Sequence, residues 1–113
     1  PGEVVLVAFP FTDWTTVKQR PAVVISSSEF NDSRPDIILC AITSQIPEKP
    51  GNDEYLLSET EQRASGLPKP SLVKLGKILT VDQRLIRKTL GQLPETSLPN
   101  LGDKLQYIFN QLL

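Results

Sequence analysis

Runs of apolar residues alternate with polar stretches along the chain, and the longest runs have the β-branched composition that is typical of strands. They cover residues 3–9, 20–26, 36–43 and 72–81, with a shorter run around 55–57. Pro and Gly mark the intervening loops, as in residues 47–52. Gly76 interrupts the longest run and predicts a bend or bulge at that point.

A different periodicity marks the C-terminal part of the chain. Leu101, Leu105, Ile108 and Leu112 recur at the spacing of one helix face and predict a terminal helix. A short helical turn is expected within residues 26–32. Short strands separated by Pro/Gly loops, with one covering helix, predict a mainly β fold with some α structure. The expected architecture is a small curled antiparallel sheet or barrel.

The length of the chain is that of one domain. Its 113 residues are 39% hydrophobic, which is enough for one core without disulfides. We find no linker, internal repeat or low-complexity tract, so we expect a single domain over residues 1–113. Pro1-Gly2 is an unusual start for a nascent chain, and we expect further residues, including the initiator Met, to precede it.

The absence of histidine is the strongest chemical restriction in the composition. The commonest general base and the commonest metal ligand are both missing, so an enzyme would have to use Arg, Lys, Thr, Ser, Asp or Glu. A lone Cys40 excludes an internal disulfide and most metal frameworks. We therefore expect no metal and no cofactor. No secretory or transmembrane stretch is visible, and we expect a cytoplasmic protein without a membrane partner.

Charge is distributed unevenly although its sum is small. A net charge of −1 is not typical of a nucleic-acid-binding domain. Residues 69–88 nevertheless carry most of the cations of the second half, namely Lys69, Lys74, Lys77, Arg84, Arg87 and Lys88. One part of the surface could therefore hold a polyanion, and the alternative is that these cations only keep the surface solvated.

An arginine and a Thr-Ser pair lie at the ends of two consecutive strands. Arg20 precedes Pro21 at the start of the second run, and Thr43-Ser44 follow the third. If these strands pair antiparallel through residues 27–35, Arg20 and Thr43 reach the same end of the sheet. A guanidinium beside hydroxyls suits a phosphate group. The alternatives are an exposed arginine at a strand start and an ordinary β-forming threonine.

Several motifs along the chain, taken in order, resemble the MazF/PemK family of toxins from type II toxin–antitoxin operons. They are Gly2-Glu3-Val4-Val5-Leu6-Val7, Phe9-Pro10-Phe11-Thr12-Asp13, Arg20-Pro21-Ala22-Val23-Val24-Ile25, Ile42-Thr43-Ser44, the stretch from Gly66-Leu67 to Thr80-Val81-Asp82, and Leu90-Gly91-Gln92-Leu93. The resemblance implies an SH3-like barrel with a C-terminal helix, a homodimer and a metal-independent endoribonuclease that cleaves single-stranded RNA. It also implies a cognate antitoxin protein whose acidic tail covers the RNA groove.

The resemblance further implies roles for individual residues. Arg20 and Thr43 would be catalytic and Ser44 would bind substrate, with the neighbouring 2′-hydroxyl of RNA as the nucleophile. Lys74 occupies a position where some relatives have an arginine, and it keeps a cation that could bind the substrate phosphate without a bidentate fork. Gly76 occupies a position where they have an aspartate, so a carboxylate is missing there.

The loop before the second strand supplies further candidates for substrate binding. Asp13 could serve as a general base or could bond its own backbone. Trp14 could stack on an RNA base or could anchor the loop. Lys18 adds a cation beside them.

Two other functions remain open at the level of sequence. The same fold resembles the CcdB toxins, which act by binding DNA gyrase without cleaving RNA. A non-toxic SH3-like adaptor would bind a peptide through aromatic side chains, but aromatic residues make up only 6% of this chain.

Overall fold

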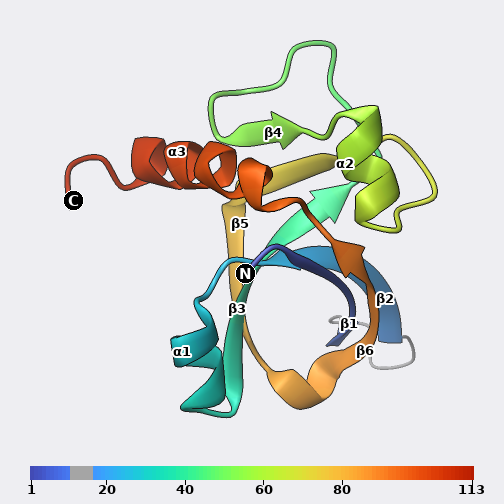
Figure 1. The fold of residues 1–113 in the computed structure, drawn as a ribbon, viewed down its shortest axis with the longest axis vertical. Helices are drawn as coiled ribbons and strands as arrows, with labels where there is room; N and C mark the ends of the chain where they lie inside the picture. The colour runs from blue at the N-terminus through green and yellow to red at the C-terminus, as the bar shows by residue number, and fades with distance from the viewer. Residues whose placement is uncertain (11–16) are drawn as a thin grey trace.

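Six strands form one antiparallel sheet in the computed structural model, which describes residues 1–10 and 17–113 (Figure 1). The strands are β1 (Glu3–Pro10), β2 (Val17–Val24), β3 (Asp36–Thr43), β4 (Glu54–Leu56), β5 (Leu72–Asp82) and β6 (Ile86–Gln92). The α-helices are α1 (Ser28–Asp32), α2 (Glu59–Ala64) and α3 (Leu98–Ile108), and short 3-10 turns cover Gln83–Leu85 (η1) and Glu95–Ser97 (η2). None of the helices in these two ranges is long and apolar enough to cross a membrane.

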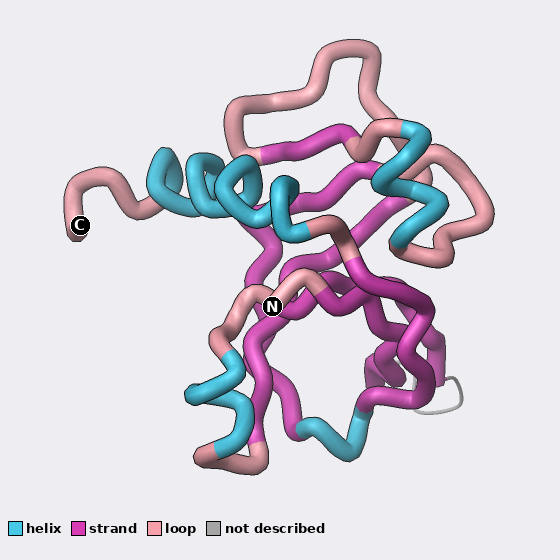
Figure 2. The backbone as a smooth tube through the Cα atoms, viewed as in Figure 1, coloured by secondary structure: helices cyan, strands magenta, loops and turns pink. Residues whose placement is uncertain are grey.

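The sheet is strongly curled but open. Its strand order is β4-β5-β3-β2-β1-β6, so β4 and β6 are the two edges. Figure 2 shows the strands curving around one end of the molecule while α2 and α3 lie at the other end. The predicted class, a small mainly β fold with a C-terminal helix, is confirmed, and the sheet curls without closing into a complete barrel.

The strands predicted from the hydrophobic pattern are present with small changes in their limits. Strand β3 has the expected bounds, and β2 begins earlier than expected and ends at Val24. The predicted bulge around Gly76 is confirmed, because Cys40 pairs with Ile78 while its neighbour Ala41 pairs with Lys74. Residues 75–77 of β5 therefore have no partner in β3.

Helix α2 and strand β6 were not predicted. The start of α2 has a capping box: the Ser58 hydroxyl accepts the Glu61 N–H at 3.1 Å, and the Glu61 carboxylate accepts the Ser58 N–H at 2.8 Å. The sequence signal, a Ser followed three residues later by Glu, is present at this point. Strand β6 is an edge strand with many exposed residues, so it lacks the apolar run that identifies a buried strand.

The C-terminal helix begins and ends earlier than its apolar spacing predicted. Helix α3 starts at Leu98, with Pro99 in its first turn, where the missing N–H costs no hydrogen bond. Leu101 is buried, as expected for the apolar face. Leu112 lies beyond the helix and is 83% exposed, so its assignment to that face was wrong.

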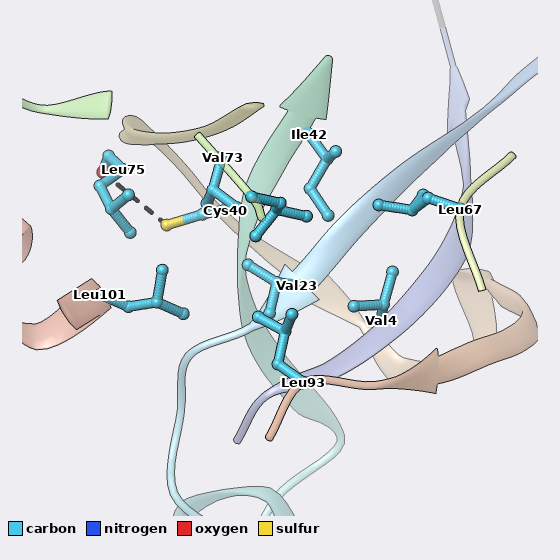
Figure 3. Packing of buried hydrophobic residues seen from close by; sticks show 10 residues of the cluster. Val4, Val23, Cys40, Ile42, Leu67, Val73, Leu75, Leu93 and Leu101 are labelled. Atoms are coloured by element: carbon cyan, nitrogen blue, oxygen red, sulfur yellow. Dashed lines mark hydrogen bonds between the residues drawn. The ribbon is translucent and has the colours of Figure 1, made fainter. Parts of the chain in front are cut away.

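Two hydrophobic clusters use opposite faces of the curled sheet. One contains Val4, Val23 and Cys40, with Leu67 and Leu101 packed from outside the sheet (Figure 3). The other lies on the opposite face and consists of Val5, Val7, Ala22, Val24, Ile37 and Leu39. Because neighbouring strand residues point to opposite faces, the adjacent residues Val4 and Val5 belong to different clusters. Burying each large apolar side chain stabilises the fold by about 1.5–3 kcal/mol.

Candidate active site

The pairing of β2 with β3 brings the arginine and the Thr-Ser pair to one end of the sheet. The two strands are antiparallel, with Ala22 opposite Ala41. Arg20 and Thr43 each lie two residues farther toward the same end, so both point to the same face. The strand pairing inferred from the sequence is therefore confirmed.

Proline explains why the sheet opens at this point. The β2–β3 ladder covers Ala22–Val24 of β2, and Pro21 stands immediately before it. Proline has no N–H to donate, so Pro21 cannot continue the hydrogen bonds from β2 to β3. Pro21 still pairs with Leu6 of β1, so β2 stays in the sheet while its contact with β3 ends.

A pocket of about 400 Å³ lies at this end of the sheet. Its lining combines the strand ends with the segment before β5, and consists of Arg20, Pro21, Ile42, Thr43, Ser44, Gln45, Leu67, Pro68, Lys69 and Ser71. The volume is within the range of small-ligand sites. The β2 strand contributes a permanently charged guanidinium, the end of β3 contributes two hydroxyls, and the segment before β5 contributes a lysine and a further hydroxyl. This combination suits an anionic ligand with several oxygen acceptors.

The Thr43 hydroxyl is held in place by the backbone that follows it. The Gln45 N–H donates a hydrogen bond to Thr43 Oγ1 at 3.1 Å. A hydroxyl that accepts a hydrogen bond still carries its own proton to donate. Thr43 is therefore oriented to donate toward a ligand in the pocket. Arg20, exposed on β2, supplies positive charge to the same pocket.

The pocket segment that carries Lys69 follows α2, a helix that is anchored by a buried carboxylate. Glu61 of α2 accepts hydrogen bonds from the Tyr55 hydroxyl at 2.8 Å and the Ser97 hydroxyl at 2.5 Å. Burial by itself raises the pKa of Glu61, but the hydrogen bonds from Ser58, Ser97 and Tyr55 outweigh it and hold the pKa below its usual value. Glu61 thus ties β4, α2 and the turn before α3 together.

The other candidates from the sequence lie outside the lining of this pocket. Lys18 is exposed on β2, and its side chain points to the same face as that of Arg20. Lys74 pairs with Ala41, and its ammonium lies 3.9 Å from the Glu54 carboxylate. Asp13 and Trp14 lie outside the described residues. The pocket therefore unites Arg20, Thr43 and Ser44 but not the two lysines.

Three of the cations in residues 69–88 have different surroundings. Lys69 lines the pocket, whereas Lys74 is close to Glu54. Arg84 binds the Asp82 carboxylate at 2.9 Å in the turn before β6, and this contact lowers the pKa of Asp82. The charge pattern alone did not reveal this division, because it depends on which acidic residues the fold places beside each cation.

Gln45 and Ser71 are pocket residues that the sequence did not single out, and Lys69 was named there only as one of the cations that could hold a polyanion. Pro68 and Pro70 on either side of Lys69 were an available signal, because paired prolines fix the backbone around a charged residue.

Over residues 1–10 and 17–113, no group of three or more Cys, Asp or Glu side chains is placed to hold a metal ion.

Solved structures with the same fold include MazF toxins and an endoribonuclease in complex with its cognate antitoxin. The Mycobacterium tuberculosis toxin MazF-mt6 superposes with a TM-score of 0.77 at 16% identity, over 96% of this chain and 96% of that one. MazF in a MazE–MazF complex from Deinococcus radiodurans gives 0.78 at 22% identity, over 96% and 93% of the two chains. A mycobacterial endoribonuclease in complex with its cognate antitoxin gives 0.78 at 12% identity, over 99% and 95%.

At these identities the structural similarity establishes the fold. No curated protein matches the sequence. A family model does match, over residues 1–109, and it describes the PemK-like, MazF-like toxins of type II toxin–antitoxin systems. The match covers every residue that lines the pocket and nearly the whole chain. The chain therefore belongs to the PemK-like, MazF-like toxin family.

Proposed function

We propose that this protein is the toxin of a type II toxin–antitoxin pair and acts as an endoribonuclease on single-stranded RNA, including mRNA, in the cytoplasm. The observation that carries the proposal is the pocket shared by Arg20, Thr43 and Ser44 in a member of this toxin family. Cleavage of mRNA would stop translation and growth. Similar folds include proteins described as endoribonucleases, which supports the same activity here.

The proposed reaction uses the RNA itself as the source of the nucleophile. The 2′-hydroxyl attacks the adjacent phosphorus, the bond from phosphorus to the 5′-oxygen breaks, and a cyclic phosphate forms. The proton leaves the 2′-oxygen, and the departing 5′-oxygen takes up a proton to become a hydroxyl. Water is not consumed, and DNA cannot react because it lacks the 2′-hydroxyl.

Arg20 and Thr43 would stabilise the charge that develops on the non-bridging phosphate oxygens. A guanidinium and an oriented hydroxyl donate toward these oxygens in a site that is already arranged before the reaction. A guanidinium is a poor proton donor because it stays charged in proteins, so the role of Arg20 is electrostatic. Ser44 adds a hydroxyl that binds the substrate, and Asp13 is the candidate carboxylate for proton transfer.

The proposal includes a homodimer and an antitoxin partner. Structures of the same fold include MazE–MazF complexes and an endoribonuclease bound to its cognate antitoxin, which supports a comparable partner for this chain. We expect an acidic antitoxin segment to occupy the cationic pocket and to exclude RNA. The CcdB-like alternative, a toxin that binds DNA gyrase, is not favoured, because the matching family model is that of the PemK-like and MazF-like toxins.

The test is cleavage of single-stranded RNA by purified protein in excess EDTA, compared with DNA of matching sequence. We expect RNA fragments whose downstream piece carries a 5′-hydroxyl, and no cleavage of DNA. The guanidinium and hydroxyls of the pocket can supply the charge stabilisation that a metal ion would otherwise provide. A strict requirement for added magnesium, or equal cleavage of DNA, would contradict the proposal.

A further inference from the structure

We propose that Lys69 is a second phosphate-binding cation of the pocket and holds a phosphate next to the one that is cleaved. This inference rests on the proposed RNA-cleaving function and names a contact with the substrate on the β5 side of the pocket, whereas Arg20 lies on the β2 side. Lys69 and Arg20 both line the pocket, but they come from different parts of the fold. Arg20 is on β2, and Lys69 lies in the segment between α2 and β5.

The backbone that carries Lys69 is fixed on both sides. Pro68 and Pro70 each lock their own φ angle and restrict the residue before them to extended conformations, which includes Lys69 itself. The Ser71 hydroxyl donates a hydrogen bond to the Lys69 carbonyl at 2.9 Å. Less conformational entropy is lost when a cation on such a fixed backbone binds a ligand.

The segment is also anchored to α2 by its preceding residue. Leu67 is buried in the hydrophobic cluster, and its N–H donates to the Gln62 carbonyl at 3.3 Å. The Gln62 side-chain amide donates in return to the Leu67 carbonyl at 3.2 Å. A lysine that served only to keep the surface solvated would not require a backbone constrained in this way.

The position of Lys69 decides which phosphate it would bind. The strand order places the end of β3, with Thr43, between β2, which carries Arg20, and β5, which the Lys69 segment precedes. The reacting phosphate belongs beside Arg20 and Thr43, and Lys69 lies on the other side of β3. Every internal nucleotide of a single strand brings its own phosphate, and an ammonium group binds one as a point charge without a fixed fork. Lys69 is therefore placed for a neighbouring phosphate, where it would set the position of the strand across the pocket.

Salt dependence of RNA binding provides the test. The probe is a fluorescein-labelled 2′-O-methyl RNA of mixed sequence, which cannot be cleaved because its 2′-oxygens are blocked, and binding is followed by fluorescence anisotropy from low to moderate salt. Loss of one phosphate contact lowers the slope of log K against log salt by about 0.7 for a single strand. We expect this reduction for Lys69→Gln and a slope close to that of the wild type for Lys69→Arg.

Lys104→Gln is the matched control, because Lys104 belongs to α3 and lines a different pocket beside Tyr55 and Asn100. It removes the same charge, and the slope should not change. An unchanged slope for Lys69→Gln, or an equal reduction for Lys104→Gln, would overturn the assignment of Lys69. RNA cleavage by the wild-type protein is measured in parallel. If the wild type binds RNA through Lys69 without cleaving it, the nuclease proposal fails and the Lys69 contact stands.

Discussion

Thr43 Oγ1 accepts the backbone N–H of Gln45 at 3.1 Å, and this bond fixes the hydroxyl at the point where β3 ends. The backbone thereby occupies an acceptor site on the oxygen and leaves the hydroxyl proton to be donated into the pocket. The orientation of this group is therefore set by the turn after the strand, before any substrate arrives.

Replacement of the Thr43 hydroxyl should slow RNA cleavage without disturbing the strand. Thr43→Val keeps the β-branched shape but removes the donor, and the loss of one neutral hydrogen bond is worth about 1 kcal/mol, or several-fold in rate. Thr43→Ser keeps the hydroxyl and should retain most of the activity. Single-turnover cleavage on folded protein measures both variants. Equal rates for Val and Ser would show that the hydroxyl takes no part.

Arg20→Ala should cause the larger loss of cleavage. Removal of one group that stabilises developing charge costs about 100- to 1000-fold in rate. Arg20→Lys should also be impaired, because an ammonium keeps the charge but cannot offer the planar pair of donors. The comparison needs single-turnover rates, with circular dichroism to verify the fold.

The double variant of Arg20 and Thr43 tests whether the two residues act on the same phosphate. If they do, their effects should not add, and the combined Ala variant should be only slightly worse than Arg20→Ala alone. A rate for Arg20→Ala close to that of the wild type would contradict the catalytic role of Arg20. That result would favour the alternative in which the toxin acts by binding a protein.

An acidic antitoxin peptide should compete with RNA for the toxin, and the toxin should be a homodimer. Light scattering at micromolar concentration measures the mass, and anisotropy of labelled RNA measures displacement by the peptide. We expect displacement because both ligands need the positive charge of the same pocket. Simultaneous binding of the peptide and RNA would contradict the shared site, and a purely monomeric mass would contradict the dimer.

Removal of the Glu61 carboxylate should destabilise the protein, because Glu61→Ala leaves the hydroxyls of Tyr55 and Ser97 without this acceptor. Each buried polar group that loses its partner costs about 1–3 kcal/mol. Glu59→Gln, on the exposed side of the same helix, removes only a surface pair with Arg63 and should cost less than about 1 kcal/mol. Urea unfolding at neutral pH compares the two variants.

The same carboxylate predicts the direction of a pH effect. The pKa of Glu61 is lower in the folded protein than its ordinary value of about 4.3, so the unfolded chain binds the proton more readily. The contribution of Glu61 to stability is therefore complete above about pH 4.3 and is lost as the pH falls toward the folded pKa. Glu61→Gln should weaken this pH dependence, and an unchanged profile would contradict the role of Glu61.

Two glycines should respond in opposite directions to alanine. Gly66 has φ +72° at the end of α2, and an added Cβ would lie 2.1 Å from the Leu90 carbonyl oxygen. Its replacement combines backbone strain of about 1–2 kcal/mol with a clash against backbone of β6. Gly102 lies in α3, and an added Cβ there would have no atom within 4 Å apart from its chain neighbours and the backbone of its own helix. Gly102→Ala should stabilise the protein by about 0.5–1 kcal/mol. Thermal unfolding of the two variants gives the comparison.

Hydrophobic spacing by itself determined the larger part of the fold. It gave β3 with its observed limits, the bulge of β5 at Gly76 and a C-terminal helix carrying the buried Leu101. These features were predictable because strand and helix periodicities are local properties of the chain. The antiparallel pairing that brings Arg20 and Thr43 together also followed from the sequence, since the connection between their strands is short.

Tertiary structure decided the features that depend on contacts between distant segments. Strand β6 is half exposed at the sheet edge, and it forms because β1 offers it a partner. The segment with Lys69 lines the pocket because Leu67, two residues earlier, packs into a cluster with residues from β1 and β2. Lys74 is separated from this pocket and lies beside Glu54, although both lysines belong to the same stretch of sequence. Charge and spacing along a chain specify which groups are present, whereas packing and strand pairing determine which of them face the same ligand.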